Sequence, residues 1–184
     1  MRNKRIAILC GHHGIGTGAS ANGVDEFKEN AYCSAALMMR LADKDYDCMI
    51  VCAEQLGNRA EMYKLWKPDI MISLHHNAFT DSSARGGELL YCGEASKKLA
   101  EALEGPLKDE LGLPWRGLKR RSGLKVLKDA EALQIPAVIV EGGFLTNLQD
   151  AVHIQHPTWP DRVATALYGG LEAWFETHPI YEYD

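Results

Sequence analysis

Several features that assign many proteins to a class are missing from this sequence. No apolar run approaches the roughly 20 residues that a membrane-spanning helix requires. Twenty basic and 25 acidic residues give a net charge of -5, and the basic residues form no long run apart from the local cluster Lys119-Arg120-Arg121. Such a charge offers no general attraction to nucleic acid. We therefore expect neither membrane insertion nor a nucleic-acid partner.

The cysteines do not indicate a disulfide framework, because there are five of them, an odd number, and no two form a C-x-x-C pair. They lie in apolar stretches, which favours buried free thiols in a reducing compartment over disulfides. The basic start Met1–Arg5 resembles that of a signal peptide, but only Ile6–Cys10 follows as an apolar core, which is too short. We therefore expect synthesis and folding in the cytoplasm.

The 184 residues, 46% of them hydrophobic, are enough for one packed domain and few for two. Short apolar runs typical of buried strands occur at Ile6–Cys10, Cys48–Ala53, Ile70–Leu74, Leu89–Cys92 and Ala137–Val140. Helical stripes lie between or after them, at Phe27–Leu41, Leu99–Leu111 and Val163–Trp174. This alternation predicts an α/β domain with a mostly parallel sheet over residues 1–177, followed by a tail at 178–184.

Three details refine the helices. Gly105-Pro106 predicts a kink or a break within the second stripe. Thr146–Gln149 matches a capping box and predicts a helix start there. Thr158 and Pro160 are expected to open the last helix.

Polar residues follow three of the predicted strands. His12 comes after the first, His75 after the third, and Glu141 after the last. Because ligands of open α/β sheets bind at the carboxyl ends of the strands, these side chains are expected to meet there. Glu26 begins the first helix, at the same edge of the sheet. The topology therefore predicts that four polar groups converge.

Two imidazoles and two carboxylates are what a catalytic zinc site needs. Such sites commonly use three His or carboxylate ligands and keep one position open for water. His12, Glu26 and His75 fit the ligands, and Glu141 fits a general base outside the metal shell. Since the helical motif H-E-x-x-H is absent, the site has to be assembled from distant segments.

The first two positions also have simpler interpretations. His12 and His13 beside glycines are compatible with an ordinary turn. Glu26 is compatible with the preference of helix first turns for acids, and Asp25 or Glu29 competes for its role.

The later positions carry more weight. A strand that ends in His75 and His76 gains nothing obvious in packing. A carboxylate such as Glu141 directly after Ala-Val-Ile-Val is expected to be partly buried, and then it needs a partner or a shifted pKa. Together the four positions favour a functional site.

The chain further resembles a known family, the zinc-dependent N-acetylmuramoyl-L-alanine amidases of the amidase-3 type, which includes bacterial cell-wall amidases and phage endolysins. The similarity runs in order from about residue 5 to residue 175. The matching segments are Gly11–Gly14, Glu26–Asn30, Ile72–Ala78, Arg116–Lys119, Val126-Leu127 and Pro136–Asn147. The last of them, with its proline, apolar strand, glutamate and G-F-L-T-N, is the most specific.

The resemblance implies a six-stranded mixed sheet flanked by helices on both faces. It implies one zinc ion per chain, held by His12, Glu26 and His75, with Glu141 as the catalytic acid and base. The implied reaction cuts the amide between the lactyl group of N-acetylmuramic acid and L-alanine of the stem peptide in peptidoglycan.

The sequence departs from the family pattern at both doubled histidines. His13 stands where the family usually has a glycine, which leaves His13 as an alternative metal ligand to His12. His76 stands where a small residue is common, and it is expected to line the cleft or orient the substrate.

Other residues are expected near the substrate or around the metal ligands. Asn30 and Asn77 are better suited to fixing loops and ligands than to binding zinc, and Asn77 is placed with His76 among the substrate-binding candidates. Arg116 and Lys119 are expected to meet the carboxylates of the stem peptide, although a solvated surface cluster is the commoner meaning of such charges.

The leading functional hypothesis is thus a peptidoglycan amidase acting as a monomer. Its alternatives are a zinc carboxypeptidase-like enzyme or another amidohydrolase, and a non-catalytic wall-binding module on the same fold. The expected setting resembles that of an endolysin, made in the cytoplasm without a signal peptide and acting on the cell wall after release.

Overall fold

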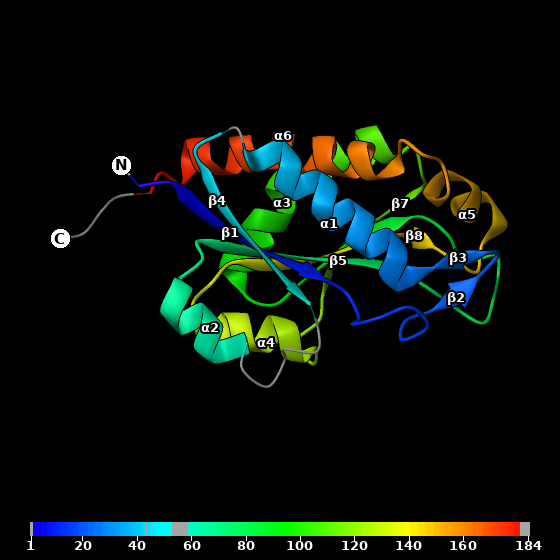
Figure 1. Cartoon of the computed structure of the whole chain (residues 1–184), viewed down its shortest axis with the longest axis horizontal. Coiled ribbons are helices and arrows are strands. Elements are labelled where there is room, and N and C mark those ends of the chain that lie inside the picture. The colour runs from blue at the N-terminus through cyan, green and yellow to red at the C-terminus, as the bar shows by residue number, and fades with distance from the viewer. Residues whose placement is uncertain (1, 43, 53–58, 181–184) are drawn as a thin grey trace.

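A computed structural model describes residues 2–42, 44–52 and 59–180 of the chain. Its centre is a six-stranded sheet in the order β4-β1-β5-β8-β6-β7 (Figure 1). The strands are β1 (Lys4–Cys10), β4 (Tyr46–Cys52), β5 (Ile70–Asn77), β6 (Gly87–Tyr91), β7 (Trp115–Arg120) and β8 (Ala137–Phe144). A separate two-stranded hairpin comprises β2 (Ser20–Ala21) and β3 (Val24–Asp25).

The sheet is mixed. The strands β4, β1, β5 and β8 run parallel to one another, whereas β6 runs antiparallel to β8 and parallel to β7. The α/β prediction with a six-stranded, mostly parallel sheet is confirmed. The carboxyl ends of β1, β5 and β8 therefore meet the start of β6 at one edge of the sheet.

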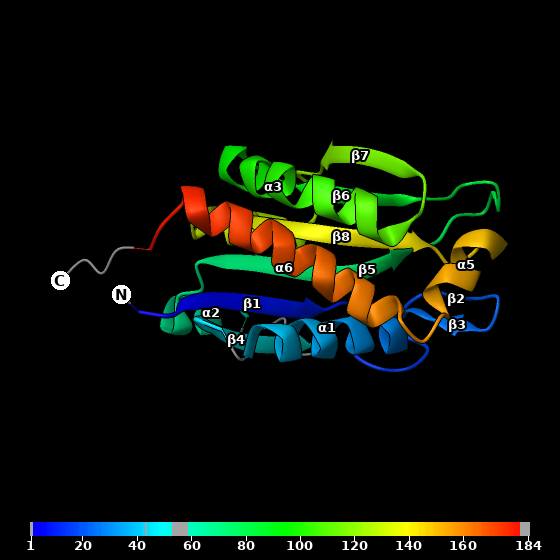
Figure 2. The ribbon, with the colours of Figure 1, turned by 90° about the horizontal axis from the view of Figure 1, so that it is seen from above.

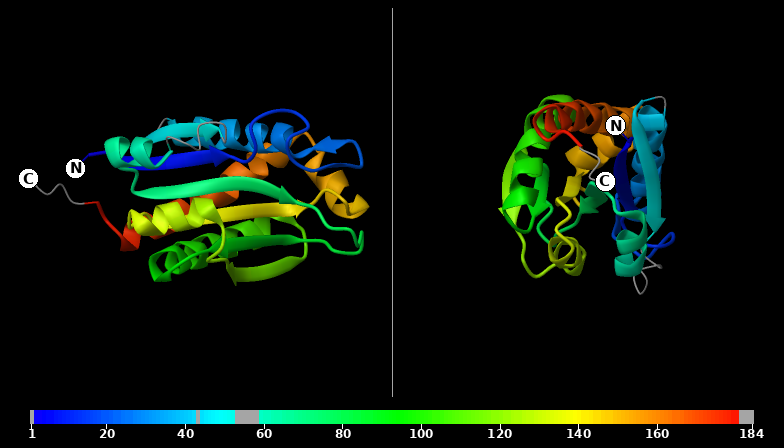
Figure 3. Two further views of the ribbon diagram at one scale, coloured as in Figure 1. Left: turned by 90° about the horizontal axis from the view of Figure 1, so that it is seen from below. Right: turned by 90° about the vertical axis from the view of Figure 1, so that its left-hand side faces the viewer.

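Helices cover both faces of this sheet (Figures 1 and 3). One layer contains α1 (Glu26–Ala42), α3 (Glu94–Leu111) and α6 (Trp159–Thr177), and the other contains α2 (Arg59–Trp66) and α4 (Lys125–Ala132). Figure 2 shows α6 lying between α1 and α3 above the sheet. The short helix α5 (Leu148–Ile154) lies with the β2–β3 hairpin at the end where β8 finishes.

Successive residues of each central strand point to opposite faces, and both faces are buried. On β1, Ile6 and Ile8 pack under α1 and α6, while Ala7 and Leu9 pack toward α2 and α4. This two-sided burial explains why the central strands are continuous apolar runs. The same alternation decides which polar side chains share a face at the edge of the sheet.

Some predicted details differ from the structure. Helix α3 continues through Pro106 without a break, and four leucines of its apolar stripe, from Leu99 to Leu111, are fully buried and hold it in place. Asn147, not Thr146, caps α5, because its side chain accepts hydrogen bonds from the backbone N–H groups of Gln149 and Asp150. The start of α6 after Thr158 is confirmed.

The remaining expectations concern cysteines, membranes and the tail. All five cysteines carry free thiols, and three of them are buried. None of the described helices combines the length and the apolar character that crossing a bilayer requires. Helix α6 ends at Thr177. Ala53 of the predicted second strand and residues 181–184 of the predicted tail lie outside the described residues.

Candidate functional site

Three of the predicted site residues form a compact cluster. Glu26, the first residue of α1, places its Oε2 atom 2.9 Å from Nε2 of His12 and its Oε1 atom 3.0 Å from Nδ1 of His75. One potential ligand atom from each residue lies within 4.8 Å of the others. His13 is exposed and does not belong to this cluster, which is the group of side chains among the described residues whose atoms lie close enough to hold a metal ion.

The loop between β1 and α1 folds tightly over this cluster. The backbone N–H of Ala19 donates to Oε2 of Glu26 at 2.9 Å, and the N–H of Glu26 donates back to the Ala19 carbonyl. A Cβ atom on Gly18 would lie 2.8 Å from the same Oε2. One on Gly11 would lie 2.5 Å from the His75 ring. Glycine is needed at both positions because the imidazoles and the carboxylate approach the backbone so closely.

The environment keeps Glu26 ionised. Burial by itself raises the pKa of Glu26, but the hydrogen bond from His75, the N–H of Ala19 and the nearby imidazoles lower it to about 2. A buried anion between two imidazoles is a suitable binding site for a cation.

A second carboxylate lies next to this cluster. Glu141 on β8 is the register partner of His75 on β5, so the two side chains share the sheet face that carries α2 and α4. Its Oε2 atom is buried and has no hydrogen-bond partner in the part of the chain that the structure describes. Burial, together with the charges of Glu26 and Glu88, raises the pKa of Glu141 to about 7. Two neighbouring carboxylates thus have very different proton affinities.

A third carboxylate, that of Glu88, lies next to Glu141. Its place in the site was not predicted from the sequence. Glu88 is the second residue of β6, it pairs with Glu141 in the antiparallel register, and it is only 4% exposed. Three predicted substrate-binding residues converge on its carboxylate: Lys119 Nζ lies 2.5 Å and Arg116 Nε 2.7 Å from Oε2, and Asn77 Nδ2 donates to Oε1 at 3.3 Å. Burial raises the pKa of Glu88, but the ammonium group of Lys119 and the guanidinium group of Arg116 outweigh this effect and hold the pKa below its ordinary value. The group of Glu88, Arg116 and Lys119 carries one net positive charge beside Glu141.

His76 lies elsewhere. It points to the face covered by α1 and α6, since it follows His75 on the same strand, and its exposed fraction is 4%. Both ring nitrogens are occupied, Nδ1 by Asn30 Oδ1 at 2.8 Å and Nε2 by the indole N–H of Trp159 at 3.1 Å. Burial lowers the pKa of His76 to about 4. This location does not fit the substrate contact that the sequence suggested for His76.

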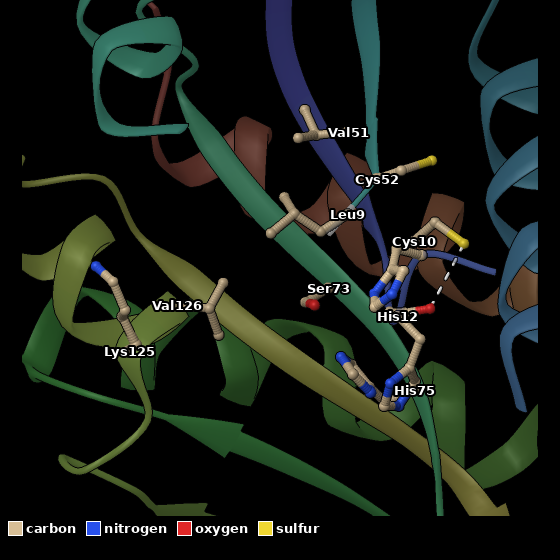
Figure 4. Close-up of a pocket in the computed structure, with 11 residues that line it drawn as sticks. Leu9, Cys10, His12, Val51, Cys52, Ser73, His75, Lys125 and Val126 are labelled. Atoms are coloured by element: carbon tan, nitrogen blue, oxygen red, sulfur yellow. Dashed lines mark hydrogen bonds between the residues drawn. The ribbon is translucent and has the colours of Figure 1, made fainter. Parts of the chain in front are cut away.

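A pocket of about 310 Å³ lies beside the cluster. Figure 4 shows His12 and His75 close together at one side of it, with Leu9, Ser73 and Val126 along its walls. Its lining residues come from the ends of β1, β4 and β5, the loop after β1, and the start of α4. The pocket provides a mainly apolar space next to the two imidazoles.

The residues present fit a zinc ion by their chemistry. Two imidazoles and one carboxylate match the ligand set of catalytic zinc sites. Glu141 does not belong to this ligand group. It lies on β8, next to His75 on β5, and its buried oxygen has no partner among the described residues.

The two carboxylates of β6 and β8 should respond oppositely to pH in the metal-free protein. Because folding raises the pKa of Glu141, its contribution to stability is fully present below pH 4.5 and is lost as the pH rises through about 7. Glu141→Gln is therefore expected to stabilise the metal-free protein at pH 8, by on the order of 2 kcal/mol. Thermal unfolding at pH 5 and pH 8 measures this, and the gain in melting temperature should be larger at pH 8.

Glu88→Gln is the matched comparison. The pKa of Glu88 is lowered in the folded state, so its contribution is present above its ordinary value and is lost as the pH falls. This variant is expected to lower the melting temperature at pH 8.

The result that would contradict the Glu141 prediction is an equal melting temperature for Glu141→Gln and the unaltered protein at pH 8. It would show that the carboxylate of Glu141 is not buried without a partner.

Comparison with known proteins provides independent information. The family profile described as N-acetylmuramoyl-L-alanine amidase matches residues 6–173. N-acetylmuramoyl-L-alanine amidase LytC of Bacillus subtilis is 28% identical over 183 residues, which cover 92% of this chain and 35% of LytC. The germination-specific N-acetylmuramoyl-L-alanine amidase of the same organism is 27% identical over 125 residues, covering 67% of this chain and 52% of that protein. The chain thus spans about half or less of the length of these relatives.

Among solved structures, the catalytic domain of CwlV, an N-acetylmuramoyl-L-alanine amidase from Bacillus (Paenibacillus) polymyxa var. colistinus, superimposes with a TM-score of 0.85 at 21% identity. The match covers 94% of this chain and 98% of that domain. At this level of identity the likeness shows a common fold.

Proposed function

The chain belongs to the N-acetylmuramoyl-L-alanine amidase family, and from this premise we propose that it is a zinc-dependent hydrolase of peptidoglycan. Its reaction cuts the amide that joins the lactyl group of N-acetylmuramic acid to L-alanine of the stem peptide. The observation that carries this proposal is the cluster of His12, Glu26 and His75 beside Glu141, one of whose carboxylate oxygens is buried without a partner among the described residues.

In this proposal His12, Glu26 and His75 hold one zinc ion. When bound, zinc lowers the pKa of a coordinated water to about 7 and polarises the carbonyl under attack. The carboxylate of Glu26 is already ionised, since its pKa is about 2, and the ligand set therefore adds one negative charge to the site. The glycines at 11 and 18 leave room for the ligands but not for a further side chain.

Glu141 is the proposed general acid and base. Its carboxylate accepts a proton from the attacking water and then passes that proton to the nitrogen of the leaving L-alanine. Burial of the side chain and the charges of Glu26 and Glu88 raise the pKa of Glu141 to about 7 in the protein without metal. A zinc ion held nearby would lower this pKa, so that the carboxylate would be ionised at neutral pH and ready to accept the proton.

The charged group on β6 and β7 is the proposed contact for the stem peptide. Arg116 and Lys119 remain 35% and 27% exposed in their side chains while Glu88 holds them in place. The Arg116 guanidinium also lies 4.8 Å above the centre of the Phe144 ring, which fixes its direction. This net positive group favours a carboxylate of the peptide, and the apolar pocket beside His12 and His75 takes the neighbouring part of the substrate.

Digestion of purified peptidoglycan by the zinc-loaded protein tests the proposal. Mass spectrometry of the products should show stem peptides with a new free amine on L-alanine. Peptides with a carboxylate on the second residue should be released faster than those with a carboxamide, because of Arg116 and Lys119. Cleavage within the peptide would support a carboxypeptidase-like enzyme instead, and wall binding without any new amine would support a non-catalytic module.

We further propose that the enzyme acts as a monomer, because all four central residues come from one chain. Light scattering of the purified protein should give the mass of a single chain. The five free thiols support synthesis in a reducing compartment, followed by action on the wall after release. In this proposal, cells that hold the protein inside an intact membrane should not lyse, and the same cells should lyse once the membrane is permeabilised and the protein reaches the wall.

A further inference from the structure

The backbone at His12 is in an unfavourable conformation. Its φ angle is +66°, in the left-handed region that non-glycine residues rarely adopt. Such a conformation persists only when the surrounding structure holds it firmly. The contacts of Gly11, the residue before His12, are therefore expected to stabilise this conformation.

Gly11 is held on both of its sides. Its N–H, which belongs to the peptide before, donates to the Leu74 carbonyl at 3.0 Å, next to His75. Its carbonyl, which belongs to the Gly11–His12 peptide, accepts a hydrogen bond from Nδ2 of Asn30 at 3.2 Å. Asn30 is completely buried and lies one helical turn beyond Glu26 on α1, so the two side chains extend from the same face of the helix.

The hydrogen bonds behind Asn30 leave only one consistent assignment. The indole of Trp159 is a donor only, so Nε2 of His76 accepts and Nδ1 of His76 carries the proton. This proton is donated to Oδ1 of Asn30, which turns the Nδ2 group of Asn30 toward the Gly11 carbonyl. The indole N–H of Trp159 therefore sets the direction of the three hydrogen bonds that link Trp159 to His76, His76 to Asn30 and Asn30 to Gly11.

We infer that Trp159, His76 and Asn30 form a positioning relay that holds the Gly11–His12 peptide, and with it the His12 imidazole, in the arrangement that binds the metal. The inference rests on the proposed zinc site, and it gives the second histidine of the 75–76 pair a role. His75 acts on one face of the sheet and His76 supports His12 from the other. Partners that orient metal ligands typically change metal affinity by about 10–100-fold when they are replaced.

Zinc affinity, measured by competition with a chelator, tests the relay. His76→Leu removes both hydrogen bonds and is expected to weaken zinc binding by about tenfold or more. His76→Asn keeps an N–H close to the position of Nδ1, so it should restore part of the affinity. Trp159→Phe keeps an aromatic ring and removes only the first donor, and a loss of several-fold is expected, which is measurable even if His76→Leu fails to fold.

Trp174→Phe is the control, because Trp174 is also buried on α6 but stacks on His178 far along the helix. It removes the same atoms and should leave zinc affinity within about twofold, while the melting temperatures of the metal-free variants report structural damage separately. Unchanged zinc affinity in folded His76→Leu and Trp159→Phe would overturn the relay and leave the zinc site standing. An unaltered protein that binds no zinc would overturn the site and the relay together.

Discussion

Glu141→Gln is expected to reduce the rate of amide cleavage by about 10²–10⁴-fold while zinc stays bound. The change replaces one oxygen of the carboxylate by an NH2 group, which gives a neutral amide of nearly the same shape, so the side chain can no longer accept and return a proton. The ligand group of His12, Glu26 and His75 does not include Glu141, which lies on the neighbouring strand. The measurement is the turnover of a muramoyl-peptide together with the zinc content of the same sample.

Glu101→Gln on the exposed side of α3 is the matched control for this change, since it removes an equal charge far from the cluster. It should leave turnover unaltered. Turnover of Glu141→Gln within a few-fold of the unaltered protein would show that another group moves the proton. Loss of zinc in this variant would show that Glu141 is a ligand and that the assignment of roles is wrong.

His12→Ala is expected to remove stoichiometric zinc and, with it, the activity. A ligand contributes more to metal affinity than a residue that only supports one, so the loss should exceed about 100-fold. The same outcome is expected for His75→Ala, since its Nδ1 atom lies 3.0 Å from Oε1 of Glu26, the carboxylate oxygen that does not contact His12. Zinc content after dialysis against a weak chelator measures both losses.

His13→Ala provides the control, because it changes the next residue of the same loop. His13 is exposed and lies outside the cluster, so this variant should keep its zinc and most of its activity. The opposite pattern, in which His13→Ala loses zinc and His12→Ala keeps it, would exchange the two histidines and invalidate the geometry of the loop after β1.

Much of the site could be predicted because the strands are apolar and parallel. An apolar run that ends in a polar residue marks the carboxyl end of a strand, and neighbouring parallel strands bring such ends together. This reasoning places His12, His75 and Glu141 at one edge of the sheet, as the structure does. Glu26 follows from the position of the first helix.

Glu88 could not be found in this way, because it stands at the beginning of its strand and not at the end. It reaches the same edge only because β6 runs antiparallel to β8, and nothing in the local sequence reveals the direction of a strand. A carboxylate next to an apolar run, the signal that identified Glu141, was nevertheless present at Glu88.

The pair His75-His76 is the opposite case, because a general rule about strands would have separated the two residues. Neighbouring residues of a strand point to opposite faces, so His75 and His76 cannot both face the cleft while β5 continues to Asn77. The apolar run ends at Leu74, so the sequence pattern predicts a strand end there and places both histidines after it. The strand β7 was missed because Trp115–Arg120 lies at the sheet edge and mixes charged with apolar residues.

In the proposed site, His12, Glu26 and His75 hold one zinc ion beside Glu141. Anomalous diffraction from a crystal of the zinc-loaded protein locates the metal directly. We expect a single zinc peak at about 2.0–2.2 Å from one atom of each of the three side chains, with Glu141 outside the ligand shell. A peak held by His13 or Glu141 in place of one of the three, or no peak at this edge of the sheet, would contradict it.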